Sequence, residues 1–183
     1  MASAPTLPLV SVEEYLRTGY EHDMEFADGV LIERGIPTPA HSALQTIVAV
    51  HLFSFRKQLH FGVMCECRVE LVKRSRYRIP DVVVCSLPIP KTKVLETVPL
   101  AAIEIWSPDD QIGQQMARFR EYWNRGVREI FVLDPEVFTA LRYQDGALME
   151  GPIYEIELPD GRKIPFPSTA LFEELRQEQS RTE

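Results

Sequence analysis

The chain has 183 residues, of which 45% are apolar, and a formal net charge of -7 at neutral pH. This length and apolar content suffice for one domain with a buried core, whereas the negative charge argues against indiscriminate binding to polyanions, so a nucleic-acid site must be a local basic patch. No apolar run reaches 18 residues and the N-terminal MASAPTLPLV has no basic region. We therefore expect a cytoplasmic protein without a membrane span or secretory signal.

The first elements expected along the chain are a short helix and a hairpin. Residues 11–19 begin with Ser11, a good N-cap, and predict a short helix. In residues 24–33, Asp28 and Gly29 separate two apolar segments. This pair is typical of the two-residue turn between antiparallel strands.

A long helix and three strand-like segments follow. Residues 38–59 start with Thr38 as N-cap and carry apolar side chains at helical spacing, which predicts a helix packed on a sheet. Residues 63–72 alternate between apolar and polar positions, as one half-solvated strand does. PDVVVCSL (80–87) and LAAIEIWS (100–107) are nearly continuous apolar runs, typical of strands in the centre of a covered sheet.

The C-terminal part predicts further sheet and helix. Residues 109–125 are amphipathic at helical spacing and end at Gly126, and residues 128–135 predict another buried strand. A last hairpin is expected to turn at Asp145-Gly146. A short helix should close the fold near residues 168–178.

This order of elements indicates helices packed around a central mixed β-sheet, so the fold class is α/β or α+β. We expect a single domain over residues 1–183, with its core at about 11–135 and a C-terminal hairpin and helix at 136–178. The three cysteines lack metal or redox spacing and lie in strand-like runs, which predicts buried free thiols; they are Cys65, Cys67 and Cys85.

Two acids stand out in the apolar runs. Glu104 alternates with Ile103 and Ile105, and burying a lone carboxylate in a sheet costs several kcal/mol unless it is paired, protonated or bound to metal. Asp81 opens the neighbouring run, so the two carboxylates can converge if the strands pair. A divalent cation relieves such repulsion, and an all-oxygen site suits Mg²⁺ or Mn²⁺. Locally, Asp81 could instead cap a turn and Glu104 could pair with Arg118.

Several segments together resemble a known family. PDVVV, IEIWSPDD and a helix ending in YWNRGVREIFVLDP occur in the order seen in the PD-(D/E)XK nuclease superfamily, specifically the Uma-type restriction endonucleases. The upstream MEFADGVLIERGIPTPAH is similar to the same family, so the resemblance runs from about residue 11 to 135. It implies a restriction-endonuclease-like fold and a Mg²⁺- or Mn²⁺-dependent endonuclease acting on DNA, with the metal held by Asp81 and Glu104.

The resemblance also suggests further site residues. The family places a lysine where this chain has Arg118, and often an acid where it has Gln114. Unlike lysine, a guanidinium stays charged, so Arg118 could stabilise a developing charge but not transfer a proton. Glu25 and His41 match other site positions. From the residues alone, however, Arg118 could be a solvated flank, Glu25 an exposed strand acid and His41 a satisfied core histidine.

A basic run precedes Asp81. Its four cations could form a solvated hairpin loop or contact DNA phosphates; they are Lys73, Arg74, Arg76 and Arg78. A homodimer is expected, because two sites could then address the two strands of a duplex. Two rival hypotheses remain: a degenerate nuclease fold that acts as a binding or assembly module, and a metal-dependent hydrolase of a smaller phosphate ester.

Overall fold

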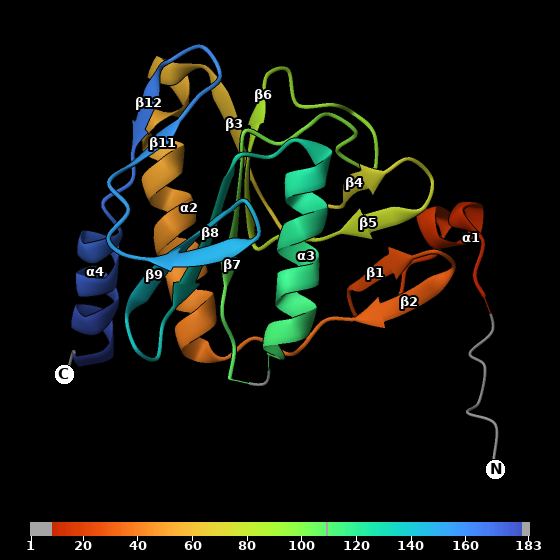
Figure 1. Cartoon of the computed structure of the whole chain (residues 1–183), viewed down its shortest axis with the longest axis horizontal. Coiled ribbons are helices and arrows are strands. Elements are labelled where there is room, and N and C mark those ends of the chain that lie inside the picture. Colours follow the sequence, from red (N-terminus) through yellow and green to blue (C-terminus); the bar gives the residue numbers. More distant parts are fainter. Residues whose placement is uncertain (1–8, 109, 181–183) are drawn as a thin grey trace.

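The computed structural model of the chain describes residues 9–108 and 110–180 (Figure 1). The helices are α1 (Val12–Arg17), α2 (Pro39–Leu59), α3 (Ile112–Arg125) and α4 (Ser168–Ser180). The strands are β1 (Met24–Ala27), β2 (Val30–Glu33), β3 (Phe61–Cys65), β4 (Val69–Val72), β5 (Arg76–Arg78), β6 (Val82–Ser86), β7 (Ala101–Ile105), β8 (Glu129–Asp134), β9 (Thr139–Gln144), β10 (Ala147–Glu150), β11 (Glu155–Glu157) and β12 (Lys163–Pro165).

The central sheet has six strands in the order β10-β9-β8-β7-β6-β3. Strands β7 and β8 pair in parallel, and the other neighbouring pairs are antiparallel. A parallel pair needs a crossover connection, and α3 provides it between β7 and β8. The predicted mixed sheet and α/β class are therefore confirmed.

Helices cover both faces of the central sheet. Ile103 and Ile105 belong to the core shared with α2 and α4, whereas Ala102 of the same strand belongs to the core shared with α3. This split follows from the alternation of side chains along a strand. Figure 1 shows α2 and α4 on one side of the sheet and α3 on the other. Glu104, being even-numbered, faces α3.

A second, four-stranded sheet has the order β2-β1-β5-β4. An aromatic cluster of Tyr15, Phe26 and Tyr77 joins α1 to strands β1 and β5. From β4, Val69 and Leu71 enter the core on the α3 side of the central sheet. The small sheet is therefore fixed beside α3, and the strands β1 and β5 bring charged side chains toward the central sheet.

The predicted caps and hairpin turns are confirmed. The hydroxyl of Ser11 accepts a hydrogen bond from the backbone N–H of Glu14, and Thr38 caps α2 in the same way. Both Asp-Gly pairs have positive φ at each residue, 50° and 90° in the first hairpin and 47° and 90° in the second. Such angles are those that a two-residue hairpin turn requires.

Other predictions need correction. Residues 63–72 form two strands in different sheets, because Glu66 has φ of 50° and breaks the extended chain. The central sheet extends past the expected core boundary near residue 135, since β9 and β10 pair beyond β8. Helix α3 begins at Ile112, and Asp109, the expected start, lies outside the described residues.

The cysteines differ from one another in burial. All three are free thiols, but only Cys85 is buried, while Cys67 is half-buried and Cys65 is exposed. Cys65 lies at the last position of an edge strand, where side chains meet solvent. Within residues 9–108 and 110–180, every helix is too short or too polar to cross a membrane.

Candidate active site

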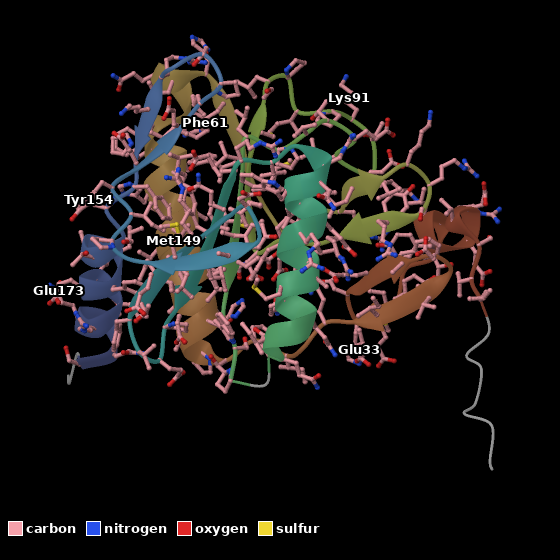
Figure 2. The ribbon with its side chains drawn as sticks, viewed as in Figure 1. Glu33, Phe61, Lys91, Met149, Tyr154 and Glu173 are labelled. Atoms are coloured by element: carbon pink, nitrogen blue, oxygen red, sulfur yellow. The ribbon has the colours of Figure 1, made fainter. Side chains whose placement is uncertain are left out.

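Asp81 and Glu104 lie on neighbouring strands and line one cleft. Strands β6 and β7 pair with Val82 opposite Ile103, which sets Asp81, just before β6, beside Glu104. Both side chains are almost fully buried, with 2% and 4% of their surface exposed. The cleft has a volume of about 510 Å³ and lies between α3, β7 and the connection after β2. Glu33, labelled in Figure 2, lies at its β2 end.

Asp81 is held by three donors. Its Oδ1 atom is 2.5 Å from Nη2 of Arg34 and 3.3 Å from Nε2 of His41, and its Oδ2 accepts a 2.6 Å hydrogen bond from the backbone N–H of Ile105. Burial acts to raise the pKa of Asp81. The hydrogen bond from His41 and the charge of Arg34 outweigh burial, so the pKa lies below its ordinary value and the group is a carboxylate at neutral pH.

Glu104 is also buried, but it is held less firmly as an anion. Its Oε1 accepts a 2.6 Å hydrogen bond from the hydroxyl of Tyr122, and its Oε2 is 3.3 Å from Nη1 of Arg118. Burial raises the pKa of Glu104 to about 7, although the charge of Arg118 acts in the opposite direction. The ion pair with Arg118 considered from the sequence is thus present.

Arg118 lies between two acids. Its Nη2 is 3.1 Å from Oε2 of Glu25, and its Nη1 contacts Glu104. Burial alone would lower the pKa of Arg118, but Glu104 and Glu25 keep it above its ordinary value. The guanidinium is mostly buried and lines the cleft, so the alternative of a solvated flank is wrong.

Glu25 supports the site from behind the cleft. Its side chain is fully buried, so the alternative of an exposed strand acid is wrong. Its Oε2 is 2.7 Å from Nη1 of Arg78, and its Oε1 accepts a hydrogen bond from the backbone N–H of Ile79. Glu25 does not line the cleft, and it acts on the site through Arg118.

The basic run divides into paired and exposed cations. Arg76 pairs with Asp28 and Glu121, and Arg78 pairs with Glu121 and Glu25. Arg78 is buried, Arg76 is half-buried, and Lys73 and Arg74 are exposed, with Arg74 in contact with Glu13. The DNA contact predicted for this run stays a prediction, with Lys73 and Arg74 as its most accessible members.

His41 links Asp81 to the loop after β7. Its Nδ1 is 3.0 Å from the hydroxyl of Ser107, while Nε2 faces Asp81. The backbone N–H of Ser107 donates to Asp110, which also accepts a hydrogen bond from Gln115. His41 is buried with polar partners at both nitrogens and lines the cleft. It therefore orients Asp81 rather than filling an apolar core.

Three residues of this arrangement were not identified as site residues from the sequence. They are Arg34, Ser107 and Tyr122. Ser107 lies within the quoted IEIWSPDD motif, and Tyr122 lies one turn after Arg118, so the sequence around both residues already pointed to the site. Arg34 follows β2 in a connection without periodicity and contacts an acid 47 residues away, so no local pattern marks it.

Asp81 and Glu104 are the buried acidic side chains that line this cleft, and they could hold a cation. Among the described residues, no group of three or more histidine, cysteine or acidic side chains could hold a metal ion. An ion here would therefore have two carboxylates and take its other ligands from water or substrate. This donor set fits Mg²⁺, which commonly retains several waters, and does not fit a closed structural site.

Comparisons with known proteins bear on the family and the fold of this chain. A family described as "Putative restriction endonuclease", Uma2, matches residues 12–172. The chain is also similar to the crystal structure of "a putative nuclease belonging to DUF820" from Anabaena variabilis, with a TM-score of 0.75, 21% sequence identity, and coverage of 91% of this chain and 99% of that chain. At this identity the likeness shows the fold. A comparison with curated proteins found no match. The chain belongs to the Uma2 family.

Proposed function

We propose that this chain is an endonuclease that hydrolyses DNA phosphodiester bonds with a divalent cation, Mg²⁺ or Mn²⁺, held by Asp81 and Glu104. One observation carries the proposal: two buried carboxylates from neighbouring strands line the same cleft as a mostly buried guanidinium. Family membership supports the nuclease class. When bound, the cation would supply positive charge beside the phosphate and lower the pKa of a water molecule.

The protein groups would have distinct tasks. Arg118 remains positively charged, because Glu104 and Glu25 raise its pKa, so it would stabilise the charge that develops on phosphate oxygens. Tyr122 fixes one oxygen of Glu104 and leaves the other toward Arg118 and the cleft. Glu25 holds Arg118 in position. His41 and the N–H of Ile105 orient Asp81.

The experiment is a cleavage assay with supercoiled plasmid and linear duplex DNA, in Mg²⁺, in Mn²⁺ and in chelator. We expect cation-dependent cleavage that Asp81→Asn abolishes. Asp160→Asn, which removes one exposed acid distant from the cleft, is the matched control and should cleave as the wild type does. Because all variants are purified identically, activity retained in Asp81→Asn would reveal a contaminant and overturn the proposal.

A non-catalytic binding module is the second candidate, and one observation favours it. Each acid of the site already has a cationic partner from the protein: Arg34 for Asp81, Arg118 for Glu104 and Arg78 for Glu25. Asp81-dependent cation binding without cleavage of any DNA or RNA would support this candidate. A panel of small phosphate esters in the same assay tests the third hypothesis, a metal-dependent hydrolase of a smaller phosphate ester.

The proposed DNA contact and homodimer have their own tests. Lys73→Ala combined with Arg74→Ala should weaken duplex binding uniformly across sequences and reduce its salt dependence, because both cations are exposed beside the smaller sheet. Light scattering would identify a homodimer, and a strict monomer at working concentration would contradict it.

A further inference from the structure

Arg34 occupies the cleft without a role in the chemistry above. It directly follows β2, its side chain is only 15% exposed, and it lines the same cleft as Asp81 and Glu104. Burial acts to lower the pKa of Arg34, but Asp81 and Glu104 raise it above its ordinary value, so the guanidinium is charged. The site therefore contains a permanent cation at the position where a divalent ion is needed.

The contact of Arg34 is directed at one carboxylate. Nη2 of Arg34 lies 2.5 Å from Oδ1 of Asp81, the same atom that faces His41, while Oδ2 is taken by the N–H of Ile105. A charge-assisted hydrogen bond between a guanidinium and a carboxylate is among the strong hydrogen bonds of proteins. A divalent cation that binds Asp81 would have to compete for Oδ1 and would be repelled by the adjacent guanidinium.

A second acid lies within reach of the same guanidinium. Nη1 of Arg34 is 3.8 Å from Oε1 of Glu66, in the connection between β3 and β4. The side chain of Glu66 is 40% exposed, and its carboxylate also accepts a weak hydrogen bond from Gln45. Arg34 thus has one buried acceptor in the cleft, Asp81, and one partly exposed acceptor, Glu66, that does not line the cleft.

We propose that Arg34 is the internal counter-ion of Asp81, that it competes with the divalent cation for this carboxylate, and that Glu66 receives the guanidinium when the cation binds. The inference rests on the proposed function, because it assumes a cation on Asp81. Arg34 is a positioning residue in this scheme: without the cation it holds Asp81 ionised and oriented, and with the cation it is released toward Glu66.

Calorimetric titration with MnCl₂ alone tests this scheme without reference to cleavage. We expect Arg34→Met to bind Mn²⁺ about tenfold more tightly than the wild type, within the range common for coupled sites. Arg128→Met is the matched control, because it removes one exposed arginine that packs on Trp123, and its Mn²⁺ affinity should equal that of the wild type. Arg34→Lys should lie between the wild type and Arg34→Met.

Glu66→Gln gives the opposite change and keeps the test decisive even if Arg34→Met fails to fold. Without its second acceptor, Arg34 should stay on Asp81, and Mn²⁺ affinity should fall about fivefold. In the double variant with Arg34→Met, Glu66→Gln should have no further effect, because there is no guanidinium to receive. A role of Glu66 as a direct attractor of the cation would instead persist in the double variant and overturn its part of the proposal.

The outcomes separate this inference from the proposed function. Unchanged Mn²⁺ affinity in Arg34→Met or in Glu66→Gln, with binding still abolished by Asp81→Asn, overturns the inference and leaves the cation site intact. Absence of Asp81-dependent Mn²⁺ binding in the wild type and in every Arg34 variant overturns both. Circular dichroism and thermal unfolding of each variant verify that the fold is retained.

Discussion

The hydroxyl of Tyr122 donates a 2.6 Å hydrogen bond to Oε1 of Glu104, and this contact joins helix α3 to the middle of the central sheet. Both side chains are buried. Burial first, and then the negative charge of Glu104, raise the pKa of Tyr122 well above its ordinary value, so the phenol remains a donor throughout the physiological range. The hydroxyl of Tyr122 thereby fixes the orientation of the Glu104 carboxyl group in the cleft.

Tyr122→Phe should show the value of this hydrogen bond, since it keeps the ring in the core and removes only the donor. A buried acceptor left without its partner costs about 1–3 kcal/mol, so the free energy of unfolding should fall by that amount at pH 8, where Glu104 is ionised. Urea denaturation measures it. Tyr154→Phe is the control, because Tyr154 is 70% exposed and points away from the protein body (Figure 2); an equal loss in both variants would refute the assignment.

The titration of Glu104 predicts how cation binding depends on pH. Burial raises the folded-state pKa to about 7 from an ordinary value of 4.5, so the stability that protonated Glu104 contributes is complete below pH 4.5 and is lost as pH rises through 7. A divalent cation requires the ionised form. The increase in melting temperature caused by Mn²⁺ should therefore grow between pH 6 and pH 8.

Glu104→Gln provides the control for this pH dependence. The substitution removes the carboxyl group that titrates and leaves the other residues of the cleft unchanged. Without metal, the variant should therefore lose the decline in stability between pH 4.5 and 7. With Mn²⁺, it should be stabilised only weakly, and equally at all pH values. If the variant retains the pH-dependent effect of Mn²⁺, another group is responsible. Thermal unfolding with and without Mn²⁺, at half-unit steps of pH, distinguishes the two results.

Glu25 should contribute more to stability than to cation binding. Glu25→Gln removes a fully buried charge that both Arg78 and Arg118 contact, and breaking a buried ion pair by removal of one partner costs about 3–5 kcal/mol. Glu13→Gln, which disrupts the exposed pair with Arg74, should cost no more than about 1 kcal/mol. Urea denaturation of both variants checks the difference, and similar small losses would contradict a structural role for Glu25.

The sequence was sufficient to predict that Asp81 and Glu104 converge, but not which residues surround them. Asp81 and Glu104 could be identified because each lies in or beside an apolar run, where a carboxylate requires an explanation, and because consecutive strands commonly pair. The pairing of Arg76 and Arg78 with Glu121 could not be foreseen, since it depends on how α3 packs beside the small sheet. The basic run therefore suggested four exposed cations, whereas two of them, Arg76 and Arg78, are paired with acids in the folded chain.

The interruption of the predicted strand 63–72 at Glu66 also depends on the folded chain rather than on local sequence. The alternation of side chains continues from residue 63 to 72, so periodicity predicts one strand, but positive φ at Glu66 redirects the chain into the second sheet. A non-glycine residue seldom adopts this angle, and no local sequence signal indicated it. That redirection also brings Glu66 within reach of Arg34, a relationship visible only in the folded chain.

Substitutions of Arg118 can distinguish an active nuclease from a nuclease fold that has lost its activity. By the resemblance, Arg118 stands where related nucleases are expected to carry a lysine, and it contacts Glu104 and Glu25 from α3. If it stabilises the transition state, Arg118→Ala should reduce turnover at saturating Mn²⁺ by about 10² or more, as the loss of one electrostatic stabiliser does elsewhere. Arg118→Lys should keep or raise activity, because an ammonium preserves the charge.

Rates of plasmid cleavage and calorimetric Mn²⁺ affinities for both variants decide this question, with Arg120→Ala, an exposed arginine of the same helix, as the matched control. Turnover unchanged in Arg118→Ala would remove Arg118 from the site. An inert wild type that gains cleavage through Arg118→Lys would identify a nuclease that lost activity with its lysine. In that case the buried pairs of Glu104 and Glu25 with Arg118 serve the fold alone, and Arg118→Ala should then lower stability while cation binding persists.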